Sequence, residues 1–301
     1  MTVSFKEVMD PDSFVRSFFG QGVDWQKKPG KFGYTEALFF SNIWVMHRKM
    51  DRGFEMCVEM TGTGCRAFES LKGEAFQWVE FLEWLCSSFD FHFSRFDVAL
   101  DVTEKWVPSV RRICQYVADR RYVSKYRRNI YTLGSEEFAF FGSPKSHVRL
   151  RVYNKALERG YPDRHWVRFE YQLCDEAAGK FVKEFLKHCN IGFCLRSCLN
   201  NAIRFTRKPC IDTTNRVRLE NVQWWDRLMA GADKISLFER VGVEYNLSRL
   251  EKYLVTQVAP SLYTYLRCHG GDITQLLEVG QARLNQRQLD LIGQFDGGMD
   301  V

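Results

Sequence analysis

Apolar residues occupy every second position in several short segments of the first two thirds of the chain, with polar residues between them. This alternation predicts β-strands that bury one face and expose the other. Ser41-Asn42 lies between two such runs and predicts a hairpin. The strands expected further along read FEMCVEM (54–60), RFDVALDV (95–102), NIYTLG (129–134), EFAFFG (137–142), HVRLRVYNK (147–155) and WVRFEYQL (166–173).

Apolar residues spaced by three and four predict helices between these strands. One helix lies in EAFQWVEFLEWLCSSF (74–89), and a second is opened by Pro108. A third follows Asp175, which is the expected N-cap. From about Leu247 the pattern is helical, and Pro260 is expected to kink or split the first helix of that region.

This mixture of hairpins and helices favours an α+β fold, with a largely antiparallel β-sheet covered on one face by helices. The strand–helix block occurs twice, before and after roughly residue 105, which suggests a duplicated unit. We expect residues 1–210 to form a catalytic domain and residues 211–301 to form a mainly helical C-terminal region.

The polar positions of four strands fall together if their apolar faces pack on the same helices. That shared surface, called here the polar face, would be unusually rich in carboxylates and cations around one tyrosine. A solvated outer face is the alternative, because antiparallel sheets commonly expose one side to water. The polar face would carry Glu55, Cys57, Glu59, Arg95, Asp97, Asp101, Arg149, Arg151, Tyr153, Lys155, Trp166, Arg168, Glu170 and Gln172.

Grouped carboxylates on a rigid sheet are hard oxygen ligands suited to Mg²⁺ or Mn²⁺, a metal that can polarise a phosphoryl oxygen. The candidate ligands are Asp97, Asp101, Glu170 and Glu59. Asp97 and Asp101 are four residues apart on one strand, so their α-carbons lie about 13 Å apart. Both therefore bind one metal directly only if the strand bulges, and the sequence leaves open which of them is a ligand.

Tyr153 lies among three cations, Arg149, Arg151 and Lys155, on the same strand face. A tyrosine hydroxyl is a poor nucleophile until cations or a metal favour the phenolate. The combination of carboxylates, cations and tyrosine fits attack on a DNA phosphodiester to give a phosphotyrosine link. Tyr131 and Tyr171 are the next candidates for the nucleophile.

The chain carries a formal net charge of +6, and its sequence pI is about 8.7. This excess suggests a polyanionic partner but is also compatible with ordinary surface. The segment from 111 to 128 concentrates seven cations among aromatic residues, which favours contact with nucleic-acid phosphates over a plain solvated helix. These cations are Arg111, Arg112, Arg120, Arg121, Lys125, Arg127 and Arg128.

Ten cysteines are scattered without paired spacing, and no apolar run approaches the length of a membrane helix. With no export signal, we expect reduced thiols and a cytoplasmic protein with no membrane partner. The segment HCNIGFCLRSC (188–198) matches no known zinc module, so buried thiols are the preferred interpretation.

The motifs RFDVALD, FFGSPKSHVRLRVYNKALER and WVRFEYQL, preceded by VEMTGTGCRAFE, together resemble the Rep_trans replication initiation factors. These are rolling-circle initiators of Gram-positive plasmids, with relatives in phages and among relaxases of conjugative elements. The resemblance covers roughly residues 55–205. It implies a sequence-specific, metal-dependent nicking–closing enzyme with Tyr153 as nucleophile and acidic positions at Asp97, Asp101 and Glu170.

The resemblance also implies origin DNA as partner, in duplex and single-stranded form, and the involvement of homodimers and a host helicase. The segment FHF (91–93) has one histidine, so the His-hydrophobic-His metal motif of the other large class of rolling-circle enzymes is absent. No N-terminal helix-turn-helix is evident, which favours a plasmid or phage initiator. A relaxase that starts conjugative transfer and a non-catalytic DNA-binding regulator are the alternatives.

Overall fold

The computed structural model describes residues 1–8, 10–126, 128–133, 137–211, 216–237, 247–284, 288–289 and 291–293. The chain forms two compact units, Met1–Phe238 and Glu239–Val301. The first unit thus continues past the boundary that was expected near residue 210. Among the described residues, no helix combines the length and the apolar character needed to cross a membrane.

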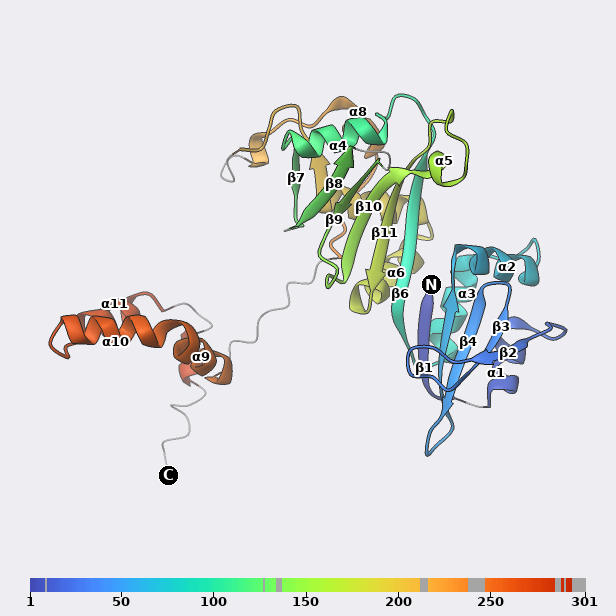
Figure 1. The fold of residues 1–301 in the computed structure, drawn as a ribbon, viewed down its shortest axis with the longest axis horizontal. Helices are drawn as coiled ribbons and strands as arrows, with labels where there is room; N and C mark the ends of the chain where they lie inside the picture. Colours follow the sequence, from blue (N-terminus) through green and yellow to red (C-terminus); the bar gives the residue numbers. More distant parts are fainter. Residues whose placement is uncertain are drawn as a thin grey trace. The chain divides into compact units, whose positions relative to one another are not determined.

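The first unit is built on a ten-stranded sheet in which every neighbouring pair of strands is antiparallel (Figure 1). Its spatial order is β2-β3-β4-β5-β1-β6-β11-β10-β9-β8. A separate two-stranded sheet pairs β7 (Tyr122–Ser124) with β12 (Ile203–Phe205). The ten strands are β1 (Thr2–Val8), β2 (Gln26–Pro29), β3 (Glu36–Phe40), β4 (Ile43–Lys49), β5 (Phe54–Met60), β6 (Phe91–Val102), β8 (Asn129–Leu133), β9 (Glu137–Phe141), β10 (Val148–Asn154) and β11 (Val167–Cys174).

The described helices of the first unit cover one face of this sheet, as the sequence predicts, and the opposite face is called here the open face. The first half is covered by α1 (Pro11–Phe19), α2 (Gly62–Lys72) and α3 (Trp78–Ser88). The second half is covered by α4 (Val110–Ala118), α6 (Glu176–His188) and α7 (Ile191–Ala202). The described part of this unit also contains two shorter helices, α5 (Lys155–Glu158) at the end of β10 and α8 (Gln223–Leu228), and a 3₁₀ turn at Arg216–Arg218.

The repeated strand–helix order is present and centres on the pairing of β1 with β6. In the first half, β1 and α1 precede the meander β2 to β5, and β5 pairs back onto β1. In the second half, β6 and α4 precede the meander β8 to β11, and β11 pairs back onto β6. The division lies between α3 and β6, not near residue 105, because β6 is the first strand of the second half.

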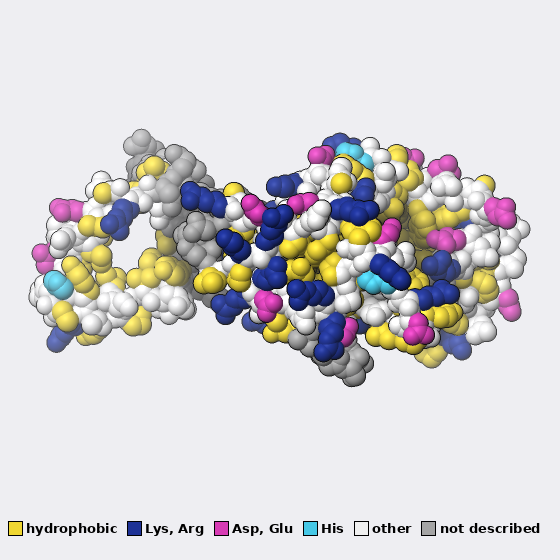
Figure 2. Space-filling model, turned by 90° about the horizontal axis from the view of Figure 1, so that it is seen from above, with side chains coloured by type: hydrophobic (Ala, Val, Ile, Leu, Met, Phe, Trp, Pro, Cys, Tyr) yellow, Lys and Arg dark blue, Asp and Glu magenta, His cyan; other side chains and the backbone are white. Residues whose placement is uncertain are grey.

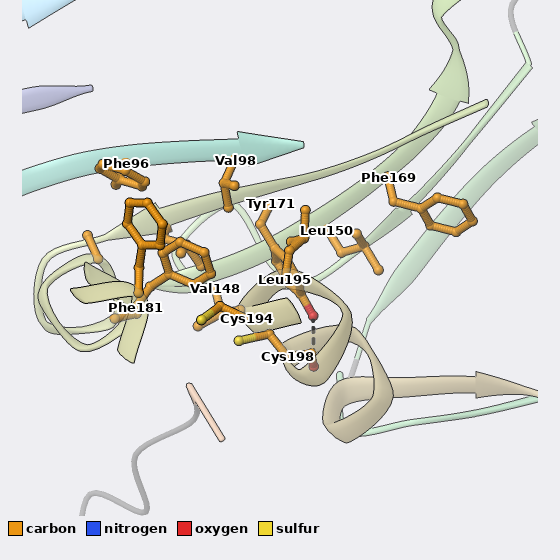
Figure 3. Close-up of a cluster of buried hydrophobic side chains, with 14 of the residues drawn as sticks. Phe96, Val98, Val148, Leu150, Phe169, Tyr171, Phe181, Cys194, Leu195 and Cys198 are labelled. Atoms are coloured by element: carbon orange, nitrogen blue, oxygen red, sulfur yellow. Dashed lines mark hydrogen bonds between the residues drawn. The ribbon is translucent and has the colours of Figure 1, made fainter. Parts of the chain in front are cut away.

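The core lies between the sheet and the helices, and the predicted alternation accounts for it. Figure 3 shows the apolar residues of β6, β10 and β11 packed on α6 and α7. Tyr171 is fully buried there, and its hydroxyl donates a 3.3 Å hydrogen bond to the Cys198 carbonyl oxygen. Cys194 and Cys198 are buried in the same core, so these two cysteines of the 188–198 segment are packing residues.

Two local predictions have different outcomes. The Ser41-Asn42 hairpin is confirmed, since both residues take positive φ (42° and 65°), as a type I′ turn requires. Asp175 does not cap α6 with its side chain. Its carboxylate lies 2.9 Å from His92 Nε2 and 3.8 Å from His147 Nδ1 instead.

The second unit is helical in its described part. It contains α9 (Leu247–Tyr253), a π-helical turn (Leu254–Val258), α10 (Ala259–Cys268) and α11 (Thr274–Ala282). The π-turn precedes Pro260, where the sequence predicts a kink, because proline has no N–H for the regular helical ladder. Gly270 and Gly271 take positive φ just beyond α10, where the helix was expected to end.

Candidate active site

Tyr153 lies near the end of β10, on the open face of the sheet. Its neighbours across the ladder are Arg168 on β11 and Phe138 on β9. The ring is largely covered, with 6% of the residue exposed, but the hydroxyl donates a 2.8 Å hydrogen bond to Glu170 Oε2. The tyrosine oxygen is therefore held against a carboxylate predicted from the sequence, on the polar face and away from the apolar core.

Asp101 and Arg168 form a second pair beside this hydrogen bond. Arg168 donates from Nε and Nη2 to the two oxygens of Asp101, each at 2.6 Å, and Trp166 Nε1 donates to Asp101 Oδ1 at 2.8 Å. Arg168 Nη1 is also 4.0 Å from Glu170 Oε2. The arginine thus connects Asp101 to the carboxylate that holds Tyr153.

Two of the three predicted cations contact the tyrosine ring rather than its hydroxyl. The Arg151 guanidinium lies 4.3 Å from the ring centroid, and Lys155 Nζ lies 5.7 Å from it. Lys155 is buried and pairs with Glu158 at 2.7 Å. Arg149 is not part of this group, since its Nη2 lies 3.6 Å from Cys174 Sγ, further along the strands.

These contacts keep the free tyrosine neutral. Burial raises the pKa of Tyr153 well above its ordinary value of 10.0, and the hydrogen bond to Glu170 with that carboxylate's charge raises it further. Arg168 acts in the opposite direction but does not outweigh them. The expectation that nearby cations favour the phenolate is therefore wrong for the protein without DNA, because the group that contacts the hydroxyl is an anion.

The four predicted metal ligands are not brought together. Asp97 is held by Arg95 through bonds of 2.7 and 2.8 Å, and Asp101 is held by Arg168. Glu59 lies on β5, which is separated from the β11 residue Glu170 by β1 and β6. Within the described residues, no group of three or more acidic, histidine or cysteine side chains could hold a metal ion. Glu170 alone of the four lies beside Tyr153.

A pocket of about 280 Å³ opens beside the tyrosine. Sequence reasoning singled out only Arg151 and Tyr153 among its lining residues. Glu158 could have been found from its position three residues after Lys155, whereas Glu137 reaches the pocket only because β9 pairs with β10. The lining comprises Glu137, Phe138, Arg151, Tyr153, Asn154, Leu157 and Glu158.

The predicted DNA-binding segment runs along α4 and into β7. Arg111, Arg112, Arg120, Lys125 and Arg128 are exposed. Arg121 is half-buried with its guanidinium over the Tyr116 ring, and Arg127 lies outside the described residues. Figure 2, which views the molecule from the side on which α4 and α8 lie in Figure 1, shows more Lys and Arg than acidic side chains around this region.

Arg111 connects this segment to the pocket, because its Nη1 lies 3.4 Å from Glu137 Oε1.

Neither alternative tyrosine shares the position of Tyr153. Tyr171 is in the core, and Tyr131 pairs with Ala139, whose side chain is buried on the helix-covered face. Among the three candidates, Tyr153 is the one placed beside acids and cations on the polar face.

Known proteins are similar to this chain along most of its length. A Bacillus subtilis (strain 168) protein named as DNA relaxase NicK is 24% identical over an alignment of 313 positions, which covers 96% of this chain and 87% of that protein. The solved structure of a rolling circle replication initiator protein from Geobacillus stearothermophilus has the same fold, with a TM-score of 0.65 and 22% identity. The likeness covers 79% of this chain and 97% of that one.

The boundary between the two family matches coincides with the boundary between the two halves of the sheet. Residues 2–84 match the N-terminal domain of rolling circle replication initiation proteins, which corresponds to the first half of the sheet with its helices. Residues 91–279, more than half of the chain, match the replication initiation factors and begin at the first residue of β6. The chain therefore belongs to the Rep_trans family of replication initiation factors.

Proposed function

We propose that this chain is a DNA nicking–closing enzyme that starts rolling-circle replication, with Tyr153 as its nucleophile. The observation that carries the proposal is the 2.8 Å hydrogen bond from the Tyr153 hydroxyl to Glu170. It joins a nucleophile to a group able to accept its proton, within the distance that general base catalysis requires.

In the proposed reaction, Tyr153 Oη attacks the phosphorus of one phosphodiester. The Oη–P bond forms and the P–O3′ bond breaks, which leaves a 5′-phosphotyrosine and a free 3′ hydroxyl. The tyrosine proton passes to Glu170, and the departing O3′ takes up one proton from the surrounding water. Attack of a 3′ hydroxyl on the phosphotyrosine reverses these steps and rejoins the strand without ATP.

The surrounding cations have separate tasks in this scheme. Arg168, whose Nη1 is 4.0 Å from Glu170, is placed to favour the anion that forms on the tyrosine oxygen. Arg151 lies over the ring and lines the pocket, where a guanidinium can hold a phosphate oxygen. Because Asp101 already fixes Arg168 through two bonds, the arginine needs little reorganisation when DNA binds.

We propose Mg²⁺ or Mn²⁺ as the cofactor, bound only in part by the protein. Mg²⁺ is usually held by one or two carboxylates together with substrate phosphates. Glu170 fits that role through the oxygen that does not accept the tyrosine hydrogen bond, whereas Asp97 and Asp101 already hold arginines. A bound metal would supply Lewis-acid polarisation of the phosphoryl oxygen.

Origin DNA is the proposed substrate, with homodimers and a host helicase as further proposed partners. Conjugative transfer uses the same nicking chemistry, and the similarity along 96% of this chain to a protein named as a relaxase favours it as a second candidate function. A plasmid or phage origin and a conjugative transfer origin are therefore both suitable test substrates.

The test is nicking of a supercoiled plasmid that carries a candidate origin. The wild-type chain should produce open circles, and mass spectrometry should find the phosphodeoxynucleotide on the peptide that contains Tyr153. The Tyr153→Phe variant should lose the adduct and the nicking while retaining duplex binding. A covalent adduct that persists in this variant, for example on Tyr131, would refute the assignment of the nucleophile.

A further inference from the structure

The open face of the first half of the sheet carries an aromatic group that the proposed reaction does not use. Ala37, Met46 and Cys57 form a small apolar cluster on this face, and the half-buried Tyr34 and Trp44 pack against it. This cluster is separate from the main core beneath the helices. Tyr34 and Trp44 therefore present aromatic surface on the open face, opposite the described helices of the first unit.

Aromatic rings and lysines are interleaved here. The rings of Phe39 and Trp44 lie 4.7 Å apart, and both side chains are half-buried. Lys31 Nζ lies 3.3 Å from the Trp44 ring centroid, and Lys28 Nζ lies 6.0 Å from that of Phe39. We call the group Tyr34, Phe39, Trp44, Lys28 and Lys31 the aromatic platform.

The ladder register puts the aromatic platform on the same face as the candidate active site. Partners across neighbouring strands point to the same side of a sheet. A row of successive ladder partners connects Trp44 on β4 with Cys174 on β11, so their side chains point to the same side of the sheet. Side chains alternate along β11, so Glu170 and Arg168 also point to that side. The intermediate partners in this row are Glu59, Thr2 and Arg95.

The distance between the aromatic platform and Tyr153 suits a single DNA strand bound along the sheet. Tyr153 is five strand spacings from Trp44 across the sheet and six residues along it. These steps amount to about 24 Å and 20 Å, which places the two side chains about 30 Å apart. Proteins that bind single strands commonly extend over such a length, with site sizes of about 4–16 nucleotides.

We propose that the aromatic platform binds unpaired bases of single-stranded DNA. Every base has a π-face that can stack on Phe39 or Trp44, whereas bases in a duplex are already stacked on each other. A base on Trp44 would take the place of the Lys31 ammonium, which would then be free to pair with a phosphate. That the bound strand is the one next to the cleaved bond rests on the proposed function; the binding itself does not.

The charges around the platform fit a DNA strand better than a second protein. Lys28 and Lys31 are both exposed at the outer end of the sheet, on β2 and just after it. Arg48, over the Tyr34 ring at 5.8 Å, is already paired with Glu55 of β5. Two lysines beside stacked rings match alternating phosphates and bases, the combination found in sequence-independent single-strand sites.

The test measures binding of a fluorescein-labelled oligothymidylate of about 20 nucleotides to the full chain by anisotropy. All proteins carry Tyr153→Phe, so no covalent product forms and the result does not depend on nicking. The double variant Phe39→Leu/Trp44→Leu should lose about tenfold or more in affinity for this oligonucleotide, with little change for a duplex of the same length. Equal losses for both DNAs, or no loss, would overturn the proposal.

The matched control is Trp84→Leu on α3, which removes a tryptophan with 36% exposure from the helix side of the molecule. It should bind the oligonucleotide as the parent does. Lys28→Gln/Lys31→Gln should lower the salt slope of single-strand binding by about 1.4, the contribution of two phosphate contacts, whereas the aromatic variant should leave that slope unchanged.

A second measurement covers the case in which the aromatic variant does not fold. Ultraviolet cross-linking of a bromodeoxyuridine oligonucleotide to the unmodified platform, followed by peptide mapping, should find the β3–β4 hairpin. Cross-links confined to other segments would overturn the proposal. Sedimentation of the folded variants tests whether a second copy of this chain binds the platform instead. Reduced self-association with unchanged oligonucleotide affinity would make this face an interface between copies and would also overturn the proposal.

Discussion

Asp101 on β6 and Arg168 on β11 are direct partners across the ladder, and the arginine gives two 2.6 Å hydrogen bonds to the two carboxylate oxygens. The same arginine lies 4.0 Å from Glu170, which accepts the Tyr153 hydrogen bond. Asp101 is therefore one step removed from the proposed chemistry. It positions the arginine and does not contact the reacting oxygen in this arrangement.

Asp101→Asn should slow nicking without removing the nucleophile. An amide offers one acceptor oxygen, so the two-bond geometry that orients Arg168 is lost. Displacements of this kind near a reacting centre cost up to about a hundredfold in rate. We expect a single-turnover nicking rate lower by between about ten- and a hundredfold.

Binding and rescue separate positioning from a direct role. The affinity of Asp101→Asn for duplex DNA should stay within about threefold of the wild type, because phosphate contacts come from cationic and polar donors and Asp101 is an anion. Asp101→Glu, which keeps a carboxylate, should recover part of the rate. A rate loss accompanied by an equal loss of DNA affinity would contradict the positioning role.

Glu170→Gln should have a larger effect. The glutamine oxygen can still accept the Tyr153 hydrogen bond, but it cannot take the proton, and general base catalysis typically contributes about 10²–10⁴-fold. The nicking rate should fall within this range.

The same substitution should change the titration of the tyrosine. Burial and, after it, the Glu170 hydrogen bond and charge raise the pKa of Tyr153, so removal of the charge should lower that pKa while burial still keeps it above 10.0. Absorbance titration of a protein, minus that of the same protein carrying Tyr153→Phe, gives the titration curve of Tyr153. This difference is measured once with Glu170 and once with Glu170→Gln. A Tyr153 pKa unchanged by Glu170→Gln would mean that the hydrogen bond does not persist in solution.

The Asp101–Arg168 pair predicts a specific acid dependence of stability. Burial would raise the pKa of Asp101, but the bonds from Arg168 and Trp166 outweigh it, so the pKa lies below its ordinary value of 3.8. A carboxyl whose pKa is lowered by folding stabilises the native state above the unfolded pKa, and this contribution is lost as the pH falls through the folded value.

Urea unfolding of the wild type and Asp101→Asn measures this contribution. The wild type should be the more stable protein at neutral pH, and the difference in free energy of unfolding should shrink below about pH 3.8. Both side chains are partly exposed, so solvent screening keeps the neutral-pH difference modest. A difference that stays constant down to about pH 2 would contradict a charged pair.

Metal removal tests the cofactor proposal. EDTA should stop nicking, and Mg²⁺ or Mn²⁺ should restore it, because a site with one carboxylate holds the ion weakly without DNA. Glu170→Ala should stay weakly active at every metal concentration. An Asp97→Ala variant should respond to metal as the wild type does, since Asp97 is held by Arg95. Full activity in EDTA would rule out the metal-assisted scheme.

The sheet could be predicted from sequence because its periodicity is regular. Along β11, and along β6 from Phe96 to Val102, large apolar residues occupy every second position, so the core face and the polar face there follow from the residue types alone. Between Phe93 and Phe96 this alternation shifts by one residue, where the register between β1 and β6 also shifts. The position of the repeat boundary could not be predicted, because it depends on which strands pair. The pairing of β6 with β1 and β11 involves contacts far apart in the chain, which local patterns do not encode.

The sequence could predict which residues share the face of the candidate site, but not which of their side chains contact each other. Alternation assigned Tyr153 and Glu170 to one face, yet a diagonal contact between neighbouring strands decides that the hydroxyl contacts the carboxylate. Alternation along the strand likewise predicted cations around the hydroxyl. Lys155 instead begins α5 and turns to Glu158, because the strand ends at Asn154, whose side chain caps that helix.

The basic segment provides the last prediction, which concerns salt dependence. Arg112, Arg120 and Arg128 are exposed cations along α4 and the strand region after it. If each neutralises one phosphate of a duplex, each contributes about 0.9 to the slope of log affinity against log salt concentration. The triple change to Gln should therefore lower the slope by about 2.7 and weaken binding to origin and unrelated duplexes alike.

A matched charge change tests whether position matters beyond net charge. Lys72, Lys183 and Lys187 are exposed on α2 and α6, and their triple change to Gln removes the same charge from other helices. Direct phosphate contact predicts that only the α4-region variant changes the slope, since counterions are released where a cation contacts a phosphate. Equal changes in both variants would mean that DNA responds to the overall field of the protein, and that 111–128 is ordinary basic surface.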